Sequence, residues 1–240
     1  MYPAQALSGP GYSVQLPPGF TVMNGVPAMG AYWLLPPNSI GPQFPAIVQI
    51  RSVPPYEIQM LVQNLYSMEN PWVAQRNAAN LGLSSVTQVY PTRPIQMPQG
   101  VAHTREFDAF TIFGIPVRVM AVVLQGAQAA VEVIVMMNLY RWVEFARPSF
   151  ELVGNIWLQG SPPPNLQLQA VVDPNRTDQV QYQFLKLDQT AIPFSSLPTQ
   201  VGAQIIIQHA EIIQAGNING TGIVLGSRNI TTATSEVKQA

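Results

Sequence analysis

The most chemically suggestive residues of the sequence stand together at residues 103–108. His103 is followed by Arg105, Glu106 and Asp108, the densest ionisable patch in the chain, and a histidine beside carboxylates is an arrangement used in general acid–base catalysis. The alternation of residue types instead favours a solvated strand face with Phe107 turned toward the core. The pattern therefore favours a structural strand, with an acid–base patch as the alternative.

Other short motifs contain the residue types of known sites but lack their spacing. His209 and Glu211 share a strand face, yet a metal site needs three or four ligands and the chain has two histidines. Residues 173–178 are oxygen-rich but lack the glycine and glutamate of a calcium loop. Ser227 lacks the second glycine of a nucleophile elbow, and residues 216–222 have no following Lys-Ser or Lys-Thr for phosphate. The sequence therefore predicts a protein that is not an enzyme, with no catalytic residue, metal or cofactor.

The shortage of charged side chains is the most unusual feature of the composition. Charged residues make up 10% of the chain, far below the usual quarter, and the formal net charge is -1. Nucleic acid is not an expected partner, because phosphate binding requires clustered Lys and Arg. A neutral surface also lacks the self-repulsion that keeps proteins apart. We therefore expect binding to copies of the chain or to another protein, with a neutral, amide-rich monomer as the alternative.

Neither a membrane-spanning segment nor a secretory signal is recognisable. The longest apolar stretch, residues 117–137, is interrupted by Gln125, Gln128 and Glu132, and it predicts two buried strands instead of a bilayer crossing. Residues 1–11 lack the basic stretch and apolar run of a signal peptide. The chain has no cysteine, so disulfides do not indicate its compartment. We expect a cytoplasmic protein or part of an exported assembly, unless a signal has been removed.

Hydrophobic periodicity predicts strands, then two helices, then strands and a closing helix. Strands are expected at residues 12–16, 20–23, 31–35, 46–53, 86–90, 103–110, 115–124 and 130–138. A helix follows Pro55, and Asn70 is placed to cap a second helix that ends at Leu81 with Trp72 facing inward. A heavily apolar helix is expected at residues 140–158. This order predicts an α+β protein, an α/β sandwich with an antiparallel sheet.

The predicted domain opens with Tyr-Ser-Val-Gln-Leu-Pro-Pro-Gly-Phe at residues 12–20 and continues with a proline-bounded meander, a hairpin at residues 115–138 and a closing aromatic helix. Together these features resemble the PsbP-like superfamily. The resemblance covers roughly residues 8–160. It implies an α/β/α sandwich around a central antiparallel sheet that works by binding another macromolecule. A fold analogy of this kind does not name that macromolecule.

A proline-rich stretch at residues 160–164 marks the expected domain boundary. We expect a PsbP-like α/β domain over residues 1–160 and a linker with a β-rich C-terminal extension over residues 161–240. The extension is too short and too polar to be expected to form a hydrophobic core of its own, so it should pack on the first domain or on a neighbouring subunit.

Isoleucines in the extension predict an assembly segment. Unprotected strands pair readily, and Lys186 is the only lysine between the linker and Lys238. The predicted segment consists of Ile205, Ile206, Ile207, Ile212 and Ile213. The sequence thus predicts a non-catalytic structural or protein-binding subunit that self-associates or docks into a larger assembly. The alternative is a small-molecule-binding protein or enzyme with a dispersed pocket near His103 or His209.

Overall fold

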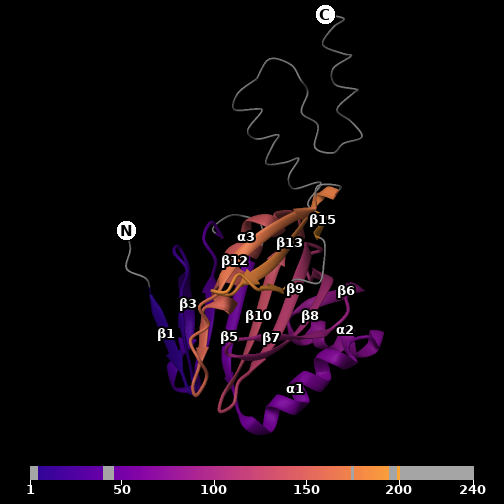
Figure 1. Cartoon of the computed structure of the whole chain (residues 1–240). Helices are drawn as coiled ribbons and strands as arrows, with labels where there is room; N and C mark the ends of the chain where they lie inside the picture. Colours follow the sequence, from indigo (N-terminus) through magenta and orange to yellow (C-terminus); the bar gives the residue numbers. More distant parts are fainter. Residues whose placement is uncertain (1–4, 40–45, 174–175, 195–198, 201–240) are drawn as a thin grey trace, which may run out of the picture.

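An eight-stranded antiparallel sheet forms the centre of the computed structural model, which describes residues 5–39, 46–173, 176–194 and 199–200 (Figure 1). Its strand order is β3-β4-β5-β10-β9-β8-β6, and β7 pairs with β8. The strands are β3 (Thr21–Val26), β4 (Ala31–Leu35), β5 (Ala46–Val53), β6 (Leu83–Val89), β7 (Arg93–Met97), β8 (Gly100–Thr111), β9 (Pro116–Gln125) and β10 (Ala130–Asn138). Every pairing is antiparallel. The predicted α+β class with a central antiparallel sheet is confirmed.

Two helices, α1 (Pro55–Ser67) and α2 (Pro71–Asn80), cover one face of this sheet. The Asn70 side chain accepts a hydrogen bond from the Trp72 backbone N–H at 2.9 Å, the N-cap predicted from the sequence. Trp72 does not face inward: it is 72% exposed. Ala74 and Ala78 are the buried residues of α2, and a residue two positions from Ala74 is turned about 200° away from it. The predicted orientation of Trp72 was wrong.

The opposite face carries α3 (Trp142–Gly154), which follows a short 3-10 turn, η2 (Leu139–Arg141). Beside it lies a three-stranded sheet of β1 (Ala6–Gly9), β2 (Tyr12–Gln15) and β11 (Ile156–Leu158). A second 3-10 turn, η1 (Pro27–Met29), joins β3 to β4. The closing helix therefore ends at Gly154, four residues before the predicted end, because Ile156 and Leu158 are buried on a strand that pairs with β2.

The β-rich C-terminal extension is present as strands β12 (Gln167–Asp173), β13 (Arg176–Leu185), β14 (Ala191–Pro193) and β15 (Thr199–Gln200). It packs on α3 (Figure 1). The Phe150 ring makes edge contacts with Tyr182 and Phe194, each at 5.2 Å between centroids, and Phe184 meets Phe194 at 4.8 Å. The division of the chain at residue 160 stays a prediction, and the described residues on its two sides share one hydrophobic core.

Glutamine side chains cover backbone groups at two strand edges. The Gln75 amide on α2 donates to the Ser84 carbonyl at 2.8 Å and accepts from the Val86 N–H at 3.1 Å, both on the outermost strand β6. Gln99, itself buried, donates to the Ile156 carbonyl on β11. A free strand edge invites pairing with another chain, and lysine is a common means of protection. Here hydrogen-bonded amides occupy these edges.

Candidate functional site

His103 does not sit in an acid–base pair. Its ring Nδ1 lies 3.4 Å from the Tyr66 hydroxyl, and the two rings make an edge contact at 6.0 Å between centroids. Burial lowers the pKa of His103 below its usual value, which favours the neutral imidazole. Among the described residues, no group of three or more His, Asp or Glu side chains converges as a metal site requires. His209 lies outside the described residues.

The patch that follows His103 is buried, so the predicted solvated strand face was wrong. Arg105 and Glu106 are each 1% exposed, and Asp108 is also buried. The reason is that β8 is covered on both faces, by α1 and α2 on one and by α3 and the C-terminal extension on the other. Alternation along the strand then sends Arg105 toward α1 and Asp108 toward α3, where Trp142 lies over its partner Arg118.

Arg105 anchors the end of helix α1. Its guanidinium donates to the carbonyls of Leu65 at 2.7 Å and Tyr66 at 3.1 Å, in the last turn of the helix, and to the carbonyl of Tyr90. The last carbonyls of a helix have no partner within it, so a cation at this point stabilises the helix end. Burial lowers the pKa of Arg105, and Glu69 on the rim partly offsets this. The role of this arginine is structural.

Asp108 and Arg118 form a closed ion pair on the other face of the sheet. Arg118 donates to the two carboxylate oxygens at 2.7 and 2.9 Å, and the Tyr90 hydroxyl donates to Asp108 at 2.7 Å. Trp142 lies 5.0 Å from the guanidinium, ring centroid to Cζ. Burial alone would lower the pKa of Arg118, but the hydrogen bond and charge of Asp108 outweigh it and raise that pKa. The charges of Asp108 and Arg118 neutralise each other and are buried, which suits a structural role.

The outer surface combines paired charges with exposed apolar side chains. The ion pairs are Arg51 with Glu57 and Glu132, Arg141 with Glu144, and Arg147 with Glu151. The large hydrophobic side chains most open to solvent are Phe113, Tyr56, Leu187, Trp72, Ile112 and Met29. None of the helices in the described part of the chain has the length and apolar content that a bilayer crossing requires.

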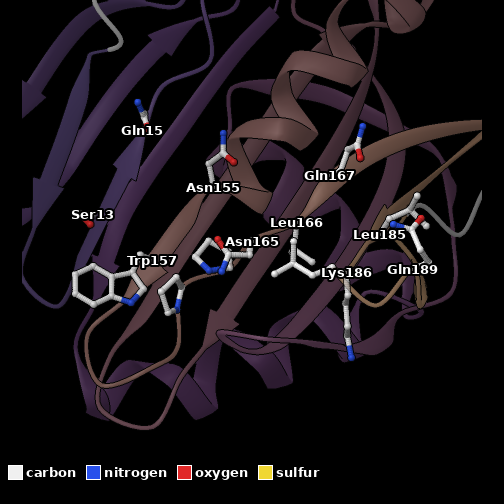
Figure 2. A pocket seen from close by; sticks show the side chains of 13 residues that line it. Ser13, Gln15, Asn155, Trp157, Asn165, Leu166, Gln167, Leu185, Lys186 and Gln189 are labelled. Atoms are coloured by element: carbon white, nitrogen blue, oxygen red, sulfur yellow. The ribbon is translucent and has the colours of Figure 1, made fainter.

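A groove of about 750 Å³ lies between the small sheet and the C-terminal extension (Figure 2). We call it the amide groove because most of its polar side chains are carboxamides. Its lining consists of Ser13, Gln15, Asn155, Trp157, Pro163, Pro164, Asn165, Leu166, Gln167, Leu185, Lys186, Leu187 and Gln189. Other grooves of the described residues include one between α2 and β6 and one beside the start of α1. His103 lines none of the three.

Trp157 is the one aromatic residue in the lining of the amide groove. It is 45% exposed because it lies between buried Ile156 and Leu158 on β11, where alternation turns it outward. Its indole N–H donates to the Ser161 carbonyl at 2.9 Å, which fixes the orientation of the ring. Sequence reasoning missed this position by placing it in a helix, although apolar residues on either side of it fit a period of two.

The predicted assembly segment, Ile205, Ile206, Ile207, Ile212 and Ile213, lies outside the described residues. The other predicted feature of the extension, its β-rich character, is present up to Gln200. The structure brings residues 13–15, 155–157, 163–167 and 185–189 together in the amide groove, a grouping that no sequence motif indicated.

Comparisons with known proteins return structures only. No protein-family model matches the chain, and no curated protein matches its sequence. The structure of cyanobacterial PsbP from Synechocystis sp. PCC 6803 is 12% identical, with a TM-score of 0.46 over 64% of this chain and 91% of that one. LpqN, involved in cell envelope biogenesis of Mycobacterium tuberculosis, is 10% identical, with a TM-score of 0.43 over 67% of this chain and 86% of that one. The structures that are similar to this chain thus include a PsbP, the kind of protein that its sequence resembles.

Proposed function

We propose that this chain is a non-catalytic, protein-binding subunit that assembles with copies of itself. The observation that carries the proposal is the surface: most charged side chains of the described residues are paired or buried, while large apolar side chains such as Phe113, Tyr56 and Leu187 are exposed. Such a surface supplies apolar area for an interface and little charge repulsion against it. The near-zero net charge of the whole chain acts in the same direction.

The C-terminal segment with Ile205, Ile206, Ile207, Ile212 and Ile213 is the proposed assembly element. Thr199 and Gln200 pair with β13, so the chain enters this segment directly from the edge of the extension sheet. Isoleucine has a high preference for strands, and an added strand gains main-chain hydrogen bonds at any open sheet edge of a second copy.

The test is the solution mass of the full chain and of a chain truncated after Gln200, measured by light scattering at high micromolar concentration. We expect the full chain to exceed the mass of one subunit and the truncated chain to approach it. A cut at the linker near Gly160 would be unsuitable, because it removes Tyr182, Phe184 and Phe194 from the core. The control is a full-length variant with the five isoleucines changed to serine, which should behave like the truncated chain.

Two results would contradict the proposal. A full chain that has the mass of one subunit at these concentrations excludes self-assembly. An assembly whose mass is the same with and without residues 201–240 excludes the proposed segment and leaves the exposed apolar surface as the interface.

A further inference from the structure

We propose that the amide groove is a binding site for a neutral oligosaccharide. This is a function beyond self-assembly, and it rests on side chains of the described residues alone. The groove has the size of a small-molecule or short-oligomer site, about 750 Å³. Its chemistry combines one fixed aromatic face, several uncommitted carboxamides and little charge, and each of these features narrows the class of ligand.

The aromatic face is that of Trp157. Its N–H is already used by the Ser161 carbonyl, so the indole offers its π-face and holds one orientation without a ligand. The negative face of an aromatic ring attracts the weakly positive C–H groups that one side of a pyranose ring presents. A ring fixed before binding loses little rotational freedom when the sugar stacks on it.

The carboxamides of the groove are available for hydroxyl groups. The side chains of Gln15, Asn155, Asn165 and Gln167 make no hydrogen bond to any part of the chain that the structure describes. A carboxamide both donates and accepts, as a sugar hydroxyl does, so the two pair in either direction. The Gln75 side chain on α2, by contrast, is engaged by backbone groups of β6.

The groove has too few cations to favour acidic ligands. Lys186 is the only ionisable residue of the lining, and recognition of a phosphate or of several carboxylates relies on arginine forks or clustered cations. A hydroxyl-rich neutral ligand brings no charge of its own that would need a partner in the groove.

The strand next to the groove is also poorly suited to an extended peptide. The Ile156 carbonyl on β11 is occupied by Gln99, which hinders pairing of a further strand at that edge. Proline-rich peptides bind between aromatic ridges, and this groove has one aromatic side chain.

Two residues of the rim have a backbone conformation that side chains seldom adopt. Asn165 has φ 40° and Gln189 has φ 64°, in the left-handed region that costs a non-glycine residue about 1 kcal/mol or more. Such conformations cluster at binding sites, where the surrounding structure holds them in place. Both residues lie on the groove, which agrees with a preformed site.

The test uses the full-length protein with defined neutral oligosaccharides: maltohexaose, cellohexaose, chitohexaose and mannohexaose. Binding is measured by calorimetry and by amide shifts in ¹H–¹⁵N spectra. We expect at least one sugar to bind saturably with Kd near or below about 1 mM, and the shifts to map to residues 155–157 and 163–167. Trp157→Ala should weaken binding about tenfold or more, and Asn155→Ala should weaken it less.

The matched control is Trp72→Ala, which removes an exposed tryptophan on the other side of the sheet. It should leave sugar affinity unchanged, and circular dichroism shows whether each variant is folded. Asn155 is exposed, so its substitution tests the site even if Trp157→Ala impairs folding. The proposal is overturned if none of the four sugars binds at about 10 mM. It is also overturned if Trp157→Ala and Asn155→Ala both leave affinity unchanged, or if only acidic sugars or proline-rich peptides bind in the groove.

Discussion

Replacing Gly154 by alanine tests whether the C-terminal extension is seated on α3 in solution. Gly154 is the last residue of α3, and a Cβ built there lies 2.5 Å from Cε1 of Phe184 on β13. Real Cβ contacts are not this short, so the Phe184 ring or the helix end has to move. The ring is not free to do so, because Phe194 packs against it at 4.8 Å between centroids.

Two opposing terms set the expected size of the effect. Alanine favours a helix over glycine by at most about 1 kcal/mol, and less at a helix end. Inserting a methyl group into a packed core costs about 1–3 kcal/mol. The cost of the steric clash should therefore exceed the gain in helix propensity, and Gly154→Ala should lower the free energy of unfolding by about 1–2 kcal/mol. For a chain of this size that is a decrease in Tm of roughly 2–8 °C.

The assay is urea unfolding of Gly154→Ala, Phe184→Leu and the double variant, followed by tryptophan fluorescence. Phe184→Leu removes the ring atoms that the new Cβ meets, so alanine at position 154 should cost less in that background. The difference defines a coupling energy between the two sites. A Gly154→Ala protein that is as stable as the parent or more stable, with no coupling to Phe184, would refute the described seating of the extension.

Three further predictions concern buried polar groups and the edge of β6. Asp108→Ala should lower the free energy of unfolding by about 3–5 kcal/mol, because it leaves Arg118 buried without its carboxylate. Asp108→Leu combined with Arg118→Met should lower it much less, as measured by urea unfolding. Equal losses of stability in the two proteins would contradict this. Burial raises the pKa of Tyr182 from 10.0 to about 12, so the unfolded chain ionises first and stability falls as pH rises through this interval. Tyr182→Phe should remove about 2–3 kcal/mol of that loss, and parallel pH profiles would contradict the assignment. Gln75→Ala should increase aggregation measured by light scattering, by freeing Ser84 and Val86 on β6; Arg76→Ala is the neighbouring control, and equal aggregation of the two variants would contradict this role.

The sequence predicts elements well where one period dominates. The expected strands at residues 31–35, 46–53 and 130–138 coincide with β4, β5 and β10. β7 was not predicted, because Pro94 interrupts it, yet an edge strand tolerates proline. The stretch that became β11 was assigned to the preceding helix, because Val153, Ile156 and Trp157 fit a helical spacing until the pairing of Ile156 with Val14 is known.

The candidate sites were harder to predict than the elements. Arg105 and Asp108 look solvated in sequence because polar residues on a strand usually face water. Only the covering of both faces of β8 shows that each of them is buried with a specific partner. The amide groove likewise could not be predicted from the sequence, because Gln15, Trp157 and Gln189 come from segments far apart in the chain.

The glutamine caps on β6 and β11 affect how this protein responds to its ionic surroundings. A strand edge protected by lysine relies on repulsion between like charges, and the range of that repulsion shrinks from about 8 Å at physiological ionic strength to about 3 Å in 1 M salt. The contacts of Gln75 with Ser84 and Val86, and of Gln99 with Ile156, are neutral hydrogen bonds that counter-ions do not screen. A high salt concentration, which weakens protection by charge, therefore leaves these two edges occupied.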